Sequence, residues 1–314
     1  MKFIRPKVVI SKCLEFDACR YDGKMISDSL IAKLKKYVDF IPICPEVEIE
    51  LGIPRDTIRL ERVSNSVSLI QPETGLEFSD RMNLFSEDYL SKILHVDGFL
   101  LKYGSPSCGV SSAKIYPKGS KIPLGKGPGL FTTKVKKYFP AHPIEEEKRL
   151  NNHIIREHFL TSIFVLADYR AVNSFDSLYK YHAKHKYLFM AYNQDLMREM
   201  GKIGANDNKL SVDVVIKLYY NLLLKLFSKR VRYQSNVNTL QHIMGYFKND
   251  VSNSEKKHFL ELINLYFQKK VTLVSINNLL FSWVLRFDNT YLKGQSFFNP
   301  YPKTLIETED NRFL

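Results

Sequence analysis

Short apolar runs rich in β-branched residues alternate with helical patterns over the first hundred residues of the chain. Residues 7–11 (KVVIS), 40–44 (FIPIC) and 98–102 (GFLLK) are typical of buried strands, because each run is short and mostly apolar. Residues 27–38 and 87–96 instead have apolar positions at helical spacing. This strand–helix–strand order predicts an α/β domain with a mainly parallel sheet.

The helical period continues without strands in the second half of the chain. Residues 145–169 predict one long amphipathic helix. Beyond Arg170 five more helices are predicted, at 175–203, 210–229, 239–249, 254–269 and 272–286. The tail, residues 291–314, contains two prolines and is predicted to be irregular. We therefore expect an α/β domain over residues 1–170 and an all-α domain over residues 171–314.

The bulk composition agrees with two soluble domains. The chain has 314 residues, 45% of them apolar, which is enough for two packed cores and too long for one typical domain. No stretch approaches the apolar length of a membrane helix, and the N-terminus lacks the basic start, apolar run and cleavage site of a secretion signal. We expect a cytoplasmic protein with no membrane partner.

The charge balance favours anionic partners. The formal net charge is +13, with 26 basic and 21 acidic residues in 1–170 and 20 against 12 in 171–314. Residues 98–144 contain eight lysines and no acid, and the Gly-, Pro- and Lys-rich stretch 119–129 predicts a flexible loop. A nucleic acid or a phosphorylated small molecule would suit such a surface, and a charge that serves only solubility is the alternative.

The four cysteines lie in the first third of the chain, at Cys13, Cys19, Cys44 and Cys108. In the expected reducing compartment a disulfide is not favoured, and no C-x-x-C pair indicates a zinc knuckle. Three of the cysteines follow the three predicted strands, whose carboxyl ends meet at one edge of a parallel sheet. This placement predicts that Cys13, Cys44 and Cys108 converge on one site; ordinary buried cysteines are the alternative.

Several short blocks surround these cysteines. They are SKCL at 11–14, CRYDG at 19–23, CPEV at 44–47 and SPSCG at 105–109, with GIPR at 52–55, FLLK at 99–102 and EKRL at 147–150. In this order the blocks resemble those of the thiouracil desulfurase family. The second half contains YHAKHK at 181–186, MA at 190–191 and the segment from Tyr291 through Gln295 to Pro300-Tyr301-Pro302. These residues resemble the YbgA-like helical domain.

The resemblance implies an enzyme with a 4Fe–4S cluster held by Cys13, Cys44 and Cys108. One iron would then lack a protein thiolate and would bind the sulfur of a thiolated pyrimidine base. Water would replace that sulfur without net oxidation or reduction, so the reaction is a hydrolytic desulfuration of a 2-thiouracil-like base. We expect Cys19 to be structural or adjacent to the cluster, and a role as fourth ligand stays the alternative.

Other polar residues of the same blocks are candidates for catalysis and substrate binding. Glu46, two residues after Cys44, is the expected general acid–base, and Asp22 is a weaker candidate that would also suit a turn. Ser105 is expected in catalysis and substrate binding, whereas Ser107 either binds substrate or only shapes the turn before Cys108. Arg20 is the expected cationic contact to substrate or cluster.

Two further interpretations stay open. The basic helical domain favours a nucleic-acid-binding or RNA sulfur-modification protein that keeps its cluster or metal for structure, with RNA as the partner. His182 and His185, three positions apart, also have metal-ligand spacing, although we find no third ligand near them in the sequence and favour a basic helix face that contacts an anionic partner. The sequence fixes neither the direction of sulfur transfer nor the oligomeric state.

Overall fold

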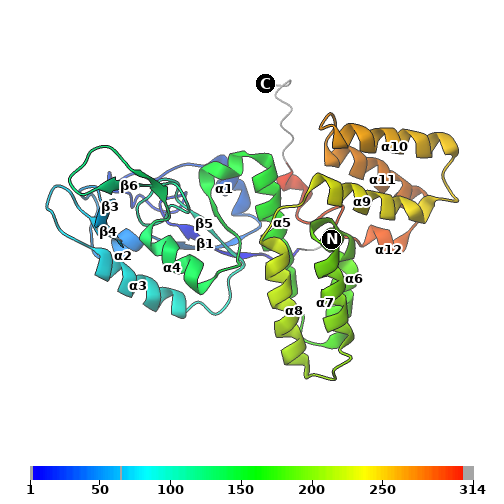
Figure 1. The fold of residues 1–314 in the computed structure, drawn as a ribbon, viewed down its shortest axis with the longest axis horizontal. Helices are drawn as coiled ribbons and strands as arrows, with labels where there is room; N and C mark the ends of the chain where they lie inside the picture. The colour runs from blue at the N-terminus through cyan, green and yellow to red at the C-terminus, as the bar shows by residue number, and fades with distance from the viewer. Residues whose placement is uncertain (1–2, 64–65, 307–314) are drawn as a thin grey trace. The chain divides into compact units, whose positions relative to one another are not determined.

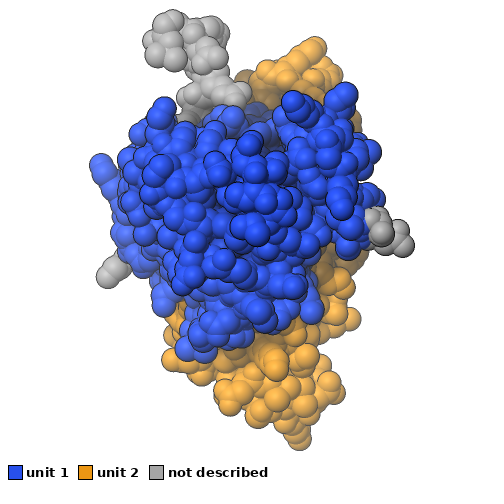
Figure 2. Space-filling model, turned by 90° about the vertical axis from the view of Figure 1, so that its left-hand side faces the viewer, with its two compact units in different colours: residues 1–167, 304–314 blue, residues 168–303 orange. Residues whose placement is uncertain are grey.

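The structure of the chain is a computed structural model that describes residues 3–63 and 66–306. The described residues form two compact units, which Figure 2 distinguishes by colour. The N-terminal unit contains the residues up to Ala167 together with residues 304–306, and the helical unit is Asp168–Lys303. The domain boundary that the sequence predicts at residue 170 stays a prediction.

The N-terminal unit is built on a four-stranded parallel sheet with strand order β2-β1-β5-β8. Its strands are β1 (Lys7–Ser11), β2 (Asp39–Ile43), β5 (Gly98–Leu101) and β8 (Ile144–Glu146). The central strand β1 has Val8, Val9 and Ile10 fully buried, as expected for a strand that is covered on both faces. The predicted α/β class with a parallel sheet is therefore confirmed for this unit (Figure 1).

A second, mixed sheet was not predicted from the sequence. Its order is β4-β3-β6-β7, formed by β3 (Arg59–Val63), β4 (Ser66–Ile70), β6 (Ala113–Pro117) and β7 (Gly125–Gly127). Only β3 and β6 pair in parallel. The prediction of a flexible loop at 119–129 is wrong for Gly125–Gly127, because these residues pair with β6.

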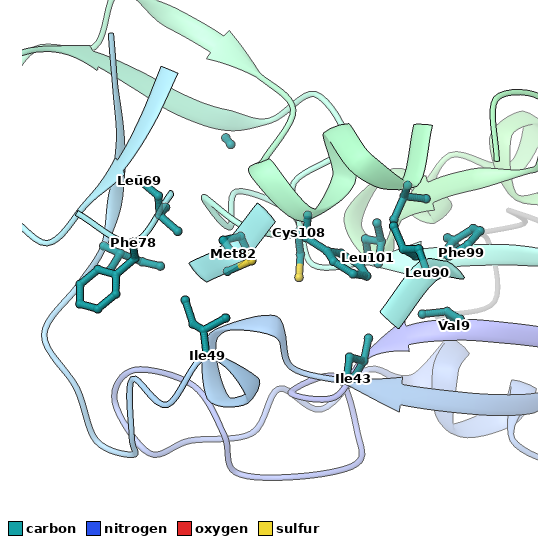
Figure 3. Close-up of a cluster of buried hydrophobic side chains, with 14 of the residues drawn as sticks. Val9, Ile43, Ile49, Leu69, Phe78, Met82, Leu90, Phe99, Leu101 and Cys108 are labelled. Atoms are coloured by element: carbon teal, nitrogen blue, oxygen red, sulfur yellow. The ribbon is translucent and has the colours of Figure 1, made fainter. Parts of the chain in front are cut away.

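One apolar cluster joins the two sheets and the helices that cover them. Val9 and Phe99 come from the parallel sheet, Leu69 from the second sheet and Met82 from the helix α3 (Ser79–Ser91) (Figure 3). Cys108 belongs to the same cluster and is 4% exposed. The loop that carries this thiol is therefore packed into the core and does not hang in solvent.

The helices of the N-terminal unit depart from the predicted bounds. They are α1 (Ser29–Leu34), α2 (Pro45–Glu48), α3 (Ser79–Ser91), α4 (Leu130–Tyr138), the 3₁₀ helix η1 (Glu147–Asn151) and α5 (His153–Tyr169). The helix predicted at 87–96 thus begins and ends earlier, because the buried positions Met82, Ser86 and Leu90 place the core face within α3. The predicted helix 145–169 is broken: residues 144–146 pair with β5, and Asn152 accepts hydrogen bonds from the first amides of α5.

The helical unit is all-α, as predicted. It contains α6 (Phe175–Tyr192), α7 (Gln194–Ala205), α8 (Val212–Phe227), α9 (Tyr233–Met244), η2 (Gly245–Phe247), α10 (Asn253–Phe267), α11 (Leu273–Arg286) and α12 (Thr290–Lys293). The helix predicted at 175–203 is two helices, since Asn193 is extended and its side chain caps α7. In Figure 1, α6, α7 and α8 pack side by side.

The tail is less irregular than predicted. The helix α12 lies within it, and η3 (Lys303–Leu305) follows. The rest of this prediction, from residue 307 onward, lies outside the described residues. No helix in the described part of the chain combines the length and the apolar character needed to span a membrane.

Candidate active site

A cavity of about 320 Å³ opens at the carboxyl ends of β1, β2 and β5. Its lining includes all four cysteines, the candidates Arg20, Glu46, Ser105 and Ser107, and also Arg55 and Lys102. This is the edge at which parallel α/β sheets place ligands. The structure thus brings the sequence-predicted residues together, with one exception: Asp22 is not part of the lining.

Cys13 is positioned by hydrogen bonds that Ser11 and Lys12 make to both neighbouring strands. Lys12 donates its amide to the Ile43 carbonyl at the end of β2 (2.8 Å), and the Ser11 hydroxyl accepts from the Lys102 amide at the end of β5 (2.9 Å). The Cys13 carbonyl accepts from the Ile26 amide at 2.8 Å. The thiol therefore leaves the sheet at a fixed position, two residues beyond β1.

Cys44 occupies the N-cap of the short helix α2, directly after β2. Pro45 follows at the first helical position, where its missing N–H costs no helix bond. This turn from strand to helix has a second effect, because it places Glu46 two residues from the thiol and on the cavity wall. The three consecutive residues CPE therefore place a thiol and a carboxylate in the same cavity.

Cys108 lies on a loop that is bound by the N-terminus of α4. The first amides of this helix donate to the loop: Leu130 to the Pro106 carbonyl (3.1 Å) and Thr132 to the Ser107 carbonyl (3.2 Å). The Thr132 hydroxyl donates to the Cys108 carbonyl at 2.7 Å. A Cβ at Gly129 would lie 2.3 Å from the Ser107 carbonyl oxygen, so only glycine permits this approach.

Three side chains hold Glu46 on the cavity wall. Its Oε2 accepts from the Arg55 guanidinium at 2.6 Å, and its Oε1 accepts from the Ser107 hydroxyl at 2.6 Å and the Ser105 hydroxyl at 3.2 Å. The side chains of Glu46 and Arg55 are 13% and 3% exposed. Ser105 Oγ also accepts from the Cys108 amide at 3.1 Å. The Glu46 carboxylate, the two serine hydroxyls and the loop that carries Cys108 are therefore joined by hydrogen bonds.

Cys19 neighbours both Cys13 and Cys44. The Cys44 thiol donates to the Cys19 carbonyl at 3.9 Å, and the interaction with the Cys13 thiol is the main reason that the pKa of Cys19 rises to about 11. The bond with Cys19, followed by burial, raises the pKa of Cys44 well above its ordinary value. Burial raises the pKa of Cys108 to about 12. All four cysteines are free of disulfides.

The donor set fits an iron–sulfur cluster by its chemistry. Three buried thiols from three strand ends line one cavity, and thiolates are the ligands that such clusters use. Within the described ranges, no three His, Cys, Asp or Glu side chains are grouped so that they could hold a single metal ion. A cluster makes a different demand, because each thiolate binds its own iron. The ligand roles of Cys13, Cys44 and Cys108 stay predictions.

Each cationic side chain in the cavity lining is paired with a carboxylate. Lys102 pairs with the buried Glu147 at 2.5 Å, and Arg55 donates to the Cys19 carbonyl at 3.1 Å. Arg20 lines the cavity and also lies 3.6 Å from Asp22, whose carboxylate accepts from the Lys24 amide in the same turn. Asp22 therefore shapes the turn that presents Arg20, and its proposed catalytic role stays an untested prediction.

Two family models match this chain. Residues 8–147 match the family model of 2-thiouracil desulfurase. The resemblance seen in the sequence is confirmed. Residues 186–302 match a second family model, DUF1722, whose description is "protein of unknown function". The uncharacterized protein YbgA of Escherichia coli (strain K12) is 23% identical over 154 residues, which cover 49% of this chain and 83% of that protein.

A solved structure, that of a 4Fe–4S-dependent thiouracil desulfidase, is also similar to this chain. The two share 27% sequence identity, and the match covers 47% of this chain and 94% of the other, with a TM-score of 0.38.

Two contributors to the site were not singled out from the sequence. Arg55 is part of the GIPR block, but only the fold shows that its guanidinium holds Glu46. Gly129 lies in a stretch that was interpreted as a flexible loop, whereas it lets α4 approach the Cys108 loop. The GPG sequence at 127–129, directly before a helical pattern, could have indicated that a helix begins here.

Proposed function

We propose that the N-terminal unit removes sulfur from a thiolated pyrimidine base such as 2-thiouracil. In the overall reaction a C=S group and water give a C=O group and hydrogen sulfide, with no net electron transfer. The observation that carries this proposal is the Glu46 carboxylate, fixed by Arg55, Ser105 and Ser107 in the cavity that also contains the three thiols. The match of residues 8–147 to the 2-thiouracil desulfurase family supports it.

In this proposal Cys13, Cys44 and Cys108 hold a 4Fe–4S cluster. With only three protein thiolates, the bound cluster would supply an iron that attracts the soft thiocarbonyl sulfur and makes the attached carbon more electrophilic. Cys19, which neighbours two of these cysteines, has a supporting role. The four free cysteines also suit a reducing compartment, and we place the enzyme in the cytoplasm.

Glu46 is the proposed general base. The carboxylate would take a proton from the water that attacks the base carbon and return it to the departing sulfur. Arg55 occupies Oε2 and leaves Oε1 facing the two serines, so the accepting oxygen has a defined position. Ser105 and Ser107 would hydrogen-bond the polar edge of the pyrimidine, and Arg20 would contact it from the opposite loop.

The test combines cluster analysis with turnover, under anaerobic conditions. Reconstituted wild type should contain about four irons and four sulfides per chain and convert 2-thiouracil into equal amounts of uracil and sulfide. Cys13→Ala, Cys44→Ala and Cys108→Ala should lose the cluster, whereas Cys19→Ala should keep it. Comparison of 2-thiouracil with thiouridine and thiolated RNA identifies the preferred substrate. A protein that takes up only zinc, or that holds the cluster without turning over any of these thiolated substrates, would contradict the proposal.

A further inference from the structure

A second pocket lies inside the helical unit, between α6, α7 and α12. Its volume is about 300 Å³. The residues that define it are Tyr179, His182 and Lys186 on α6, Gly201 and Gly204 on α7, and Tyr291 on α12. Within each of the two long helices these positions recur at intervals of three or four, so one face of α6 confronts one face of α7.

The pocket contains a lysine whose charge is uncompensated. Lys180 pairs with Asp176 and Lys184 pairs with Asp168, both on or beside the same helix. Lys186, by contrast, has no ion-pair partner among the residues that the structure describes. A lone ammonium group on the wall of a pocket attracts an anion.

His182 presents a neutral hydrogen-bonding atom to the same space. Its Nδ1 lies 2.8 Å from the Tyr219 hydroxyl, which leaves Nε2 directed at Gly201. Burial, together with the charge of Lys186, lowers the pKa of His182 to about 4, so the imidazole is uncharged at neutral pH. One ring nitrogen is thus available to a ligand.

The two glycines keep the pocket open. Glycine is less favourable than alanine inside a helix, so packing usually explains its presence. Here packing does not require it: a Cβ at Gly204 would meet nothing within 4 Å, and one at Gly201 would meet only the His182 ring, at 3.5 Å. A methyl group at either position would instead fill the pocket.

Two partly exposed tyrosines add aromatic faces to the pocket wall: Tyr179 is 51% exposed and Tyr291 38%. The Tyr291 ring lies 6.2 Å from that of Tyr246 in a stacked arrangement and 6.3 Å from that of Tyr187, and the Tyr179 ring stacks on Phe175. Aromatic faces of this kind favour a planar ligand.

We propose that this pocket binds a small organic anion that carries one planar ring and one oxyanion group. Lys186 binds the oxyanion, the tyrosines contact the ring and His182 donates or accepts one hydrogen bond. The volume limits the ligand to this size, at the lower end of ligand pockets. The proposal is independent of the reaction in the N-terminal unit.

Calorimetry with the full chain tests the proposal, with phenyl phosphate, phenol and inorganic phosphate as probes. Phenyl phosphate should bind saturably and should shift the NMR resonances of the His182 ring. Phenol and inorganic phosphate should each bind at least about tenfold more weakly. Lys186→Met should weaken phenyl phosphate binding by about tenfold or more and leave phenol unchanged. Lys180→Met, which removes a paired lysine from the same helix, is the matched control and should change nothing.

A second variant separates pocket volume from folding. Gly204→Ala should fold at least as stably as wild type and lose most phenyl phosphate binding, because its methyl group enters the open space. Gly245→Ala, at an equally open position outside the pocket, should bind normally. The proposal is overturned if phenyl phosphate does not bind saturably, or if Lys186→Met and Gly204→Ala leave its binding unchanged.

Discussion

The two units use similar polar residues for different ends. In the N-terminal unit Glu46, Ser105 and Ser107 bond to one another on the wall of a cavity. In the helical unit Asp168 and Ser296 flank His185, with Asp168 Oδ2 2.8 Å from Nε2 and Ser296 Oγ 2.7 Å from Nδ1.

The second constellation has the residue types of a hydrolytic triad, but it is closed to substrate. His185 and Ser296 are each 2% exposed, and the pocket of the helical unit is lined by His182 and not by His185. The comparison shows that residue types and distances do not make a catalytic site without adjoining space. Here Asp168, His185 and Ser296 join α5 to α6 and to the segment after α12.

The largest effect is expected at the carboxylate of the cavity. Glu46→Gln should reduce kcat/KM for 2-thiouracil by about 10²–10⁴-fold, because the amide cannot accept a proton from water. Iron content should stay close to wild type, whereas the free energy of unfolding should fall by about 3 kcal/mol, because the buried Arg55 guanidinium loses its charged partner. Glu48→Gln, on the exposed side of the same helix α2, is the control. Equal activity losses in both variants would argue against a proton-transfer role of Glu46.

The scaffold of the cavity is tested at Gly129. Gly129→Ala should destabilise the protein by about 3 kcal/mol, because the new Cβ meets backbone atoms of Ser107 and Pro106 that cannot yield. Urea unfolding measures this, and iron content should fall as the Cys108 loop shifts. Gly125→Ala, where nothing lies within 4 Å, should change stability by less than about 0.5 kcal/mol. A stable Gly129→Ala protein with a full cluster would contradict the packing of α4 on this loop.

The buried network of the helical unit should respond in stability. Asp168→Asn removes the charge that holds Lys184 (2.7 Å) and His185, and we expect a loss of about 2 kcal/mol in the free energy of unfolding. Asp176→Asn makes the same change in an exposed pair with Lys180 and should cost less than about 0.5 kcal/mol. Turnover of 2-thiouracil should be unaffected by Asp168→Asn while the protein is folded, and a specific loss of kcat would link this network to catalysis.

The effect that is smallest at neutral pH is the pH dependence of stability that comes from His182, because it develops only in acid. Its pKa is lowered from 6.5 to about 4 in the folded protein, so the unfolded chain binds the proton more readily. The resulting stability is complete well above pH 6.5 and is lost as the pH falls towards 4, by about 3 kcal/mol. Denaturant midpoints across this range should fall less steeply in His182→Gln than in wild type; parallel curves would show that His182 titrates normally.

The pattern of the sequence determined the main features of the cavity. Runs of apolar residues located β1, β2 and β5, and the parallel arrangement brought Cys13, Cys44 and Cys108 to one edge. This works because the direction of a parallel strand fixes where its carboxyl end lies, whatever the loops do. Glu46 followed from its distance of two residues from Cys44.

The tertiary structure decided the partners of these residues. The guanidinium of Arg55 reaches Glu46 from nine positions further along the chain, and α4 binds the Cys108 loop from more than twenty residues away. The pairing of β3 with β6, and the meeting of Asp168 with His185, are contacts of the same long-range kind. A local pattern reports which side of a segment is buried. It does not report which distant segment covers that side, because this depends on packing of the whole chain.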